Sequence, residues 1–247
     1  MSRAKCAMGA AAMLIATGLA LVPFARQQYR LYGLKARLQE AIARDAGYTE
    51  TILKLEKDAP SVTYQELFEL CDKSINKRTD LIAEVRGLYP DVNAPAKEKL
   101  IEYLNSVNGF VRSKKAFFTA HLRMSSILDT QSEFVRRSNA YQAAVAGDLR
   151  RRDVTSAEAN LSAWNVLIRE GAQLDEQVRS ATSEAVAKAD AYARACDELA
   201  RTESESERAL RMLGVPFRPI FRAYHRQSLE EADKLKGIAS AATRRGA

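Results

Sequence analysis

The feature that most constrains this chain is the spacing of its apolar residues, which recur every three or four positions with few interruptions. This spacing matches the 3.6-residue period of an α-helix and does not match the two-residue period of a strand. The 247 residues include only 11 glycines and 6 prolines, so the turns that a β-sandwich or a doubly wound α/β fold needs are scarce. We therefore expect an all-α fold.

Three clusters of helix-breaking residues divide this pattern. Proline restricts the residue before it and lacks a backbone donor, so helices should end near Pro60 and near the loop 90–95. Gly214, which is followed by two prolines, should end a long fourth helix. The predicted helices span residues 26–58, 61–89, 96–150, about 153–213 and 220–238, and we expect the last to be exposed and frayed.

The fourth predicted helix carries the clearest packing seam. Large side chains lie at its ends and small ones in its middle, so another helix can approach closely. The seam comprises Trp164, Leu167, Leu174, Val178, Ala181, Ala185, Tyr192 and Leu199. A similar seam on the third helix comprises Leu100, Leu104, Val107, Val111, Phe118 and Leu122. We expect these two helices to form an antiparallel hairpin within an elongated four-helix bundle or coiled coil.

An uncharged segment precedes the helical body. Residues 6–25 contain no charged side chain, and twenty helical residues span about 30 Å, the thickness of the hydrocarbon layer of a bilayer. Tyr29 and Tyr32 follow at headgroup depth, where amphipathic rings are favoured. The segment is therefore predicted to be a transmembrane helix. The alternative is a signal peptide, for which Gly18-Leu19-Ala20 is the best cleavage sequence.

The basic residues that flank this segment bear on orientation. Four of them lie between positions 26 and 37, ahead of any acidic residue, whereas Arg3, Lys5 and the amino terminus precede the segment. The positive-inside rule then favours a cytoplasmic body, with a periplasmic body as the alternative. The expected organisation is a short amino-terminal segment 1–5, a transmembrane helix 6–25, a helical bundle 26–213, and a turn with a peripheral helix or tail at 214–247.

The composition argues against several function classes. The net charge of +7 is mild for this length, and no basic stripe interleaved with aromatic residues suggests a nucleic-acid partner. A di-iron bundle needs Glu-x-x-His, but Phe118 precedes His121 by three residues and Arg222 precedes His225. Phosphate-binding, dinucleotide-binding, zinc-protease and nucleophile-elbow motifs are also missing from the sequence. We expect no catalytic, cofactor-binding or metal-binding residues.

The second predicted helix contains one charged residue within an apolar stripe. The stripe comprises Phe68, Cys71, Ile75, Arg78, Ile82 and Val85. An arginine in such a place either extends its charged end to solvent or pairs with a carboxylate. For the second case, Asp175 or Glu176 is the favoured partner. The body cysteines, Cys71 and Cys196, are expected to be small core residues.

The same segment resembles a known family signature. Phe68, Cys71, Ile75, Lys77, Arg78, Asp80, Leu81 and Ile82 are similar to the motif of LemA family proteins, in which a basic pair precedes Asp-Leu-Ile. Residues 112–116 look like the Ala-Arg segment that follows in that family, whereas Ala83 and Glu84 depart from its usual Pro-Asn. The resemblance implies a single-pass membrane protein with a cytoplasmic helical bundle, and it brings no enzymatic residues.

These features together favour a non-enzymatic scaffold or adaptor that is tethered to the membrane. Its partners would be the lipid bilayer and either a helical protein or a second copy of the chain, which would dock by helix packing. The alternative is a periplasmic or extracytoplasmic helical sensor or secretion-associated domain, with the same anchor or with a cleaved signal peptide.

Overall fold

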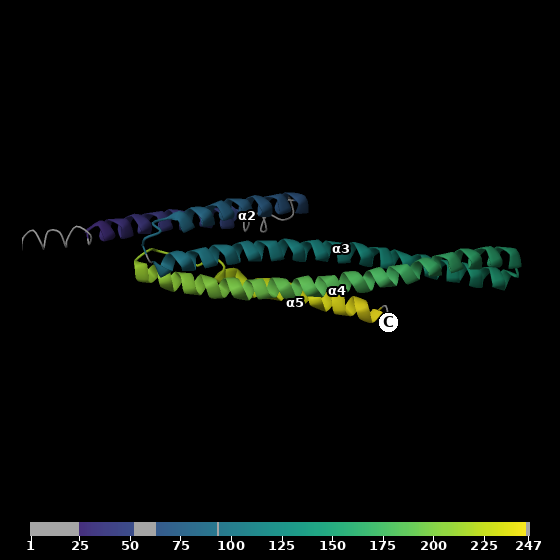
Figure 1. The fold of residues 1–247 in the computed structure, drawn as a ribbon. Coiled ribbons are helices and arrows are strands. Elements are labelled where there is room, and N and C mark those ends of the chain that lie inside the picture. The colour runs from purple at the N-terminus through teal and green to yellow at the C-terminus, as the bar shows by residue number, and fades with distance from the viewer. Residues whose placement is uncertain (1–24, 52–62, 93, 246–247) are drawn as a thin grey trace, which may run out of the picture. The chain divides into compact units, whose positions relative to one another are not determined.

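A computed structural model describes residues 25–51, 63–92 and 94–245 of the chain, and every regular element in these ranges is a helix (Figure 1). Residues 25–51 are helical, and α2 (Tyr64–Gly87), α3 (Pro95–Arg151), α4 (Val154–Leu213) and α5 (Arg222–Arg245) follow. The prediction of an all-α fold is confirmed. The predicted transmembrane segment 6–25 lies outside the described residues except for Ala25, and no helix among the described residues is long and apolar enough to cross a bilayer.

The chain forms two compact units. Unit 1 contains the described residues up to Asn108 together with Leu199–Phe221, and unit 2 contains Gly109–Glu198 together with the described residues from Arg222 onward. Unit 1 therefore holds the helix 25–51, α2, the first part of α3 and the last part of α4. Unit 2 holds the rest of α3 and α4, with α5.

The start of α2 is fixed by a capping box. The backbone N–H of Glu66 donates to the Thr63 hydroxyl at 3.3 Å, and the backbone N–H of Thr63 donates to the Glu66 carboxylate at 2.8 Å. Each side chain thus satisfies a backbone donor that the first turn of a helix leaves without a partner. The backbone N–H of Thr63 and its hydroxyl both donate to the Glu66 carboxylate, which stabilises the charged form and lowers the pKa of Glu66.

The α3–α4 connection in unit 2 is a two-residue turn. Arg152 adopts a left-handed conformation with φ of 60°, and the backbone N–H of Asp153 bonds back to the carbonyl of Asp148 at 3.0 Å. Asp153 then caps α4 by accepting from the backbone N–H of Ser156 at 3.1 Å. The reversal sends α4 back along α3.

Contacts within unit 2 show that the hairpin is antiparallel. Phe117 stacks on Tyr192 with ring centroids 4.9 Å apart, and further along α3, Arg123 pairs with Glu184 at 2.7 Å. Towards the turn, the Trp164 indole donates to Ser138 at 3.0 Å. Residues later in α3 therefore contact residues earlier in α4. Figure 1 shows the two helices running in opposite directions.

The predicted seam of α4 is mostly buried. Leu167, Leu174, Val178, Ala181, Ala185, Tyr192 and Leu199 are buried, and Trp164 is half-buried. The prediction of the α3 seam is confirmed from Leu100 to Val111, where the predicted residues are buried. Beyond Val111 the prediction is wrong, because Phe117 and Met124 are buried instead of Phe118 and Leu122. Adjacent Phe117 and Phe118 fit the helical spacing almost equally well, and packing against Tyr192 selects the former.

The description of the last helix as exposed and frayed is wrong. α5 continues to Arg245 and buries one face in unit 2, formed by Ser228, Ala232, Leu235, Ala239 and Ala242. These residues recur at three- and four-residue steps, so they lie on one side of the helix. Most are alanines, which contribute little hydrophobicity, and the face was therefore easy to overlook in the sequence.

Candidate functional site

The most unusual group of residues in unit 1 surrounds Arg78 of α2. Its side chain has 0% exposure, and its nearest neighbours in the stripe, Ile75 and Ile82, are also buried. A buried charge is costly unless hydrogen bonds and an opposite charge compensate it. The interpretation in which Arg78 extends to solvent is therefore excluded.

The guanidinium of Arg78 is held by the helix 25–51 and by α3. Its Nε donates to the Asp45 carboxylate at 2.5 Å, and its Nη2 donates to the Thr49 hydroxyl at 3.3 Å. Its Nη1 donates to the side-chain oxygen of Asn108 at 3.2 Å and to the hydroxyl of Ser74 at 3.3 Å. All four partners are buried. Every nitrogen of the guanidinium therefore has an acceptor.

Tyr103 of α3 completes this network on its acidic side. The Tyr103 hydroxyl is hydrogen-bonded to Asp45, and its ring packs edge-on against Phe217 at 5.2 Å between centroids. Burial, followed by the negative charges of Asp45 and Glu203, holds the pKa of Tyr103 well above its usual value. Tyr103 is therefore a neutral donor at physiological pH.

A second buried carboxylate in unit 1 fixes the segment after α4. Glu203 accepts from the backbone N–H groups of Ile220 and Phe221 at 2.7 and 2.8 Å. The Ser206 hydroxyl donates to the carbonyl of Lys99 at 2.6 Å, which ties α4 to α3 in the same unit. Buried polar groups thus determine how both α2 and the segment 214–221 are placed in unit 1.

The interhelical ion pair of Arg78 is present, but the expected partner is wrong. Asp175 and Glu176 belong to unit 2, whereas the carboxylate that binds Arg78 comes from Asp45 in the preceding helix. The sequence did contain a signal for it. Leu34, Leu38, Ala41, Asp45 and Thr49 recur at three- and four-residue steps and are all buried, so polar residues interrupt that stripe as Arg78 interrupts its own.

The LemA-like motif divides between the core and the surface of α2. Cys71, Ile75, Arg78, Leu81 and Ile82 are buried, and Phe68 is half-buried. Lys77 and Asp80 are exposed, and the Lys77 ammonium lies 5.5 Å from the centre of the Tyr48 ring. The motif therefore describes one packed face of α2 around Arg78, with charged residues beside it.

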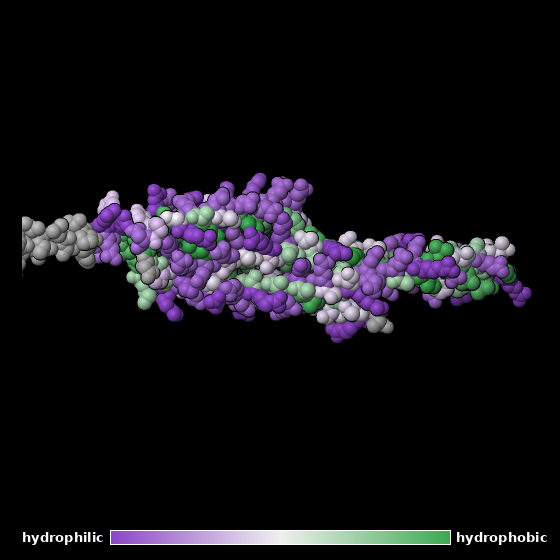
Figure 2. Space-filling model, viewed as in Figure 1, coloured by the Kyte–Doolittle hydropathy of each residue, from purple (hydrophilic) through white to green (hydrophobic). Residues whose placement is uncertain are grey.

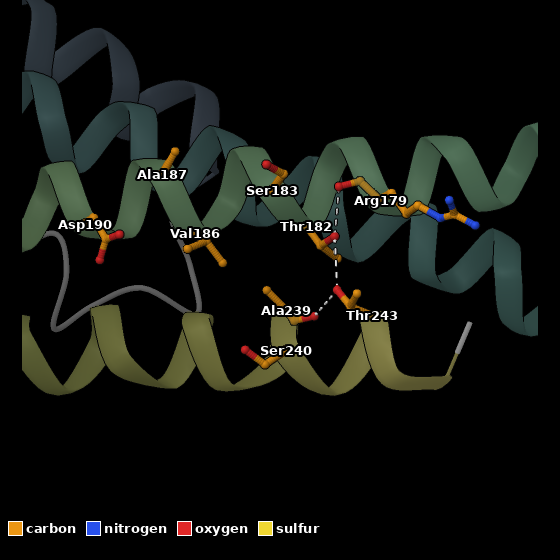
Figure 3. A pocket seen from close by; sticks show the side chains of 9 residues that line it. All are labelled: Arg179, Thr182, Ser183, Val186, Ala187, Asp190, Ala239, Ser240 and Thr243. Carbon is orange, nitrogen blue, oxygen red and sulfur yellow. Dashed lines mark hydrogen bonds between the residues drawn. The ribbon is translucent and has the colours of Figure 1, made fainter. Parts of the chain in front are cut away.

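Unit 2 contains a shallow groove of about 450 Å³ between α4 and α5 (Figure 3). The Thr243 hydroxyl, within the groove, donates to the carbonyl of Ala239 at 3.0 Å, and its oxygen lies 3.4 Å from the Thr182 hydroxyl. Asp190 pairs with Lys236 at 3.1 Å. The lining, mostly of small side chains, comprises Arg179, Thr182, Ser183, Val186, Ala187, Asp190, Ala239, Ser240 and Thr243. This set includes no nucleophile–base pair.

Cys196 and His225 of unit 2 each lie in an ordinary structural setting. Burial raises the pKa of the Cys196 thiol to about 11, so it is protonated at neutral pH. His225 bonds to Asp197 at 2.8 Å on the surface of unit 2. Among the described residues, no group of three or more His, Cys, Asp or Glu side chains could hold a metal ion.

No known protein family, characterised protein or solved structure matches the chain. The structural class that the described residues define is an all-helical protein with a buried arginine network in one unit and an antiparallel hairpin in the other. The network has no exposed guanidinium atom that a substrate could reach. Its contacts fix the positions of α2, α3 and the helix 25–51 within unit 1.

Proposed function

We propose that the chain is a single-pass, membrane-anchored helical protein of LemA-like type that acts as a non-enzymatic scaffold or adaptor. In this proposal, residues 6–25 form the anchor and the body extends as an elongated bundle on the cytoplasmic side. The exposed helix faces of the body are the surfaces on which partners dock.

The observation that supports a membrane anchor is the exposure of the helix that directly follows the uncharged segment. Residues 25–29 are already helical and exposed, and Leu34 is the first buried residue of the described part of unit 1. Tyr29 and Tyr32 are 79% and 75% exposed, which is unusual for aromatic residues beside a packed core. Aromatic rings at the membrane interface, together with Arg26 and Arg30, provide a reason for this exposure.

The scaffold role is supported by the kind of interior that the body has. Unit 1 holds a buried ion pair that fixes α2 against the helix 25–51 and α3. Buried polar networks of this type favour one helix arrangement over others. A rigid, well-specified helical surface is what an adaptor needs in order to present one docking face.

The anchor can be tested by alkaline extraction of membranes that contain the full chain. We expect the chain to remain in the membrane, and Leu14→Arg combined with Leu19→Arg to release it, because a central arginine costs about 2.5–3.5 kcal/mol on insertion scales. Leu122→Arg is the matched control, because Leu122 lies at the surface of the body. Release of the unsubstituted, full-length chain would contradict the proposal.

The orientation can be tested with a reporter fused to the carboxyl terminus. A cytoplasmic reporter supports the proposed scaffold, whereas an external reporter supports the extracytoplasmic sensor or secretion-associated domain. The intact mass of the purified chain distinguishes an uncleaved anchor from a removed signal peptide, because cleavage after Ala20 would remove the first 20 residues.

A further inference from the structure

The part of the α3–α4 hairpin nearest its turn has an exposed apolar face. We call it the hairpin face and define it by Val135 and Leu149 of α3 and by Val154, Leu161 and Ile168 of α4. These side chains are 43–61% exposed. Figure 2 shows hydrophobic residues on the surface of this part of the hairpin. Contiguous exposed apolar residues commonly mark a protein interaction site.

The three residues from α4 have the spacing of a coiled-coil position. Val154, Leu161 and Ile168 are seven residues apart, which places them in one line along the helix. Two further heptads along the same line lead to Thr182, which contacts Thr243 of α5. α5 ends at Arg245, shortly after that contact. The hairpin face therefore lies on the same side of α4 as the surface on which α5 packs further along that helix.

The charge pattern of this region suits a second copy of the chain. Residues 138–147 and 159–168 contain no charged side chain, although 28% of the chain is charged. Residues 125–172 contain six basic and six acidic residues, so their net charge is zero while the whole chain carries +7. Two copies would therefore meet where electrostatic repulsion between them is weakest.

Antiparallel pairing about Leu161 also places opposite charges together. With Leu161 of each copy on a two-fold axis, Val154 lies across from Ile168 of the other copy, since each is seven residues from the centre. Asp153 then lies across from Arg169 of the other copy, and both residues are exposed. Such an isologous pairing covers the hairpin faces of both copies.

We propose that the hairpin face is a self-association surface on which a second copy packs antiparallel, with its α4 centred on Leu161. The proposal deepens the scaffold role and rests on it, because it names the partner that a helix face of the body accepts. The two hairpins then form a four-helix arrangement in which the heptad line of each is buried.

Cysteine cross-linking of the full chain in membranes tests this pairing. All variants carry Cys6→Ala, which leaves only the buried Cys71 and Cys196 as native thiols. Leu161→Cys should form a covalent homodimer on mild oxidation, several-fold more than Val166→Cys. Val166 is the matched control, because it is 54% exposed on the same helix but five residues from Leu161 and off the heptad line. Mixed Val154→Cys and Ile168→Cys chains should cross-link to each other more than either does alone.

Three results would overturn the proposal. They are equal cross-linking of the Leu161→Cys and Val166→Cys chains, no dimer from either chain, and an adduct between Leu161→Cys and a different protein. Circular dichroism of each purified variant must show the helix content of the parent chain. If only the self-association is wrong, the chain will form no specific dimer but will stay in the membrane fraction. If the proposed membrane anchor is wrong, alkaline extraction will release the chain, so the two failures can be distinguished.

Discussion

Replacement of Arg78 by alanine tests whether its buried ion pair specifies unit 1. The substitution leaves Asp45 buried without its cation, and it removes hydrogen bonds from Thr49, Ser74 and Asn108. Loss of one member of a buried pair costs about 3–5 kcal/mol. With a guanidinium m-value of roughly 2–6 kcal/mol/M, the unfolding midpoint should fall by on the order of 1 M.

Arg44→Ala is a matched control for this experiment. Arg44 also links the helix 25–51 to α2, through Glu84 at 2.7 Å, but both side chains are more than a third exposed. Exposed pairs contribute about 0–1 kcal/mol, so the midpoint should change little. The measurement is guanidinium unfolding of the purified full chain, followed by circular dichroism at 222 nm.

Two further variants separate the charge effect from a loss of packing. Asp45→Ala should lower the unfolding midpoint as much as Arg78→Ala does, because it leaves the guanidinium buried without a negative charge beside it. Arg78→Met combined with Asp45→Leu should recover much of the lost stability, since apolar replacement of both partners is often close to neutral. A midpoint shift for Arg78→Ala no larger than that for Arg44→Ala would show that the buried ion pair does not specify unit 1.

Three other measurements follow from the described contacts. Gly171→Ala should fail to stabilise the chain, because its Cβ would lie 2.5 Å from the Phe134 ring. Gly109→Ala, whose Cβ would meet no atom within 4 Å, should raise the unfolding free energy by about 0.5–1 kcal/mol. Equal gains in the melting temperatures of the two variants would contradict this. Alkylation of Cys196, followed by peptide mass spectrometry, should be slow at pH 8 and accelerate towards pH 11, since its raised pKa leaves little thiolate; fast labelling at pH 8 would refute the burial. The folded-state pKa of Glu66 is lowered, so its contribution to α2 is complete above its ordinary pKa and is lost as the pH falls through the folded value; an NMR titration that gives an unshifted Glu66 would contradict the capping box.

Much of the fold could be predicted from the sequence because its helices are long and their breaks are chemically plain. Gly214, with φ of 77°, follows the last residue of α4, as the sequence indicated. The α3 boundaries differ from the prediction by one residue at each end. Long periodic segments average over many weak preferences, so their existence and type are the most dependable features of a sequence.

The partner of Arg78 could not be predicted in the same way. Helical periodicity shows which face of a helix is buried, but it does not show which helix covers that face or how the two are aligned. Asp45, Thr49 and Asn108 come from two helices whose alignment depends on packing across the whole of unit 1. The buried face of α5 was missed for another reason, since its alanines bury well but contribute little to hydrophobicity.

The division into units has a consequence for how this protein can be dissected. The chain leaves unit 1 after Asn108, returns at Leu199 and departs again after Phe221. No single contiguous fragment therefore contains all of unit 1 without the α3–α4 segment of unit 2. Equal deletions in α3 and α4 on both sides of their turn would remove only residues of unit 2 and keep every residue of unit 1. The length of the α3–α4 hairpin could then be varied in steps.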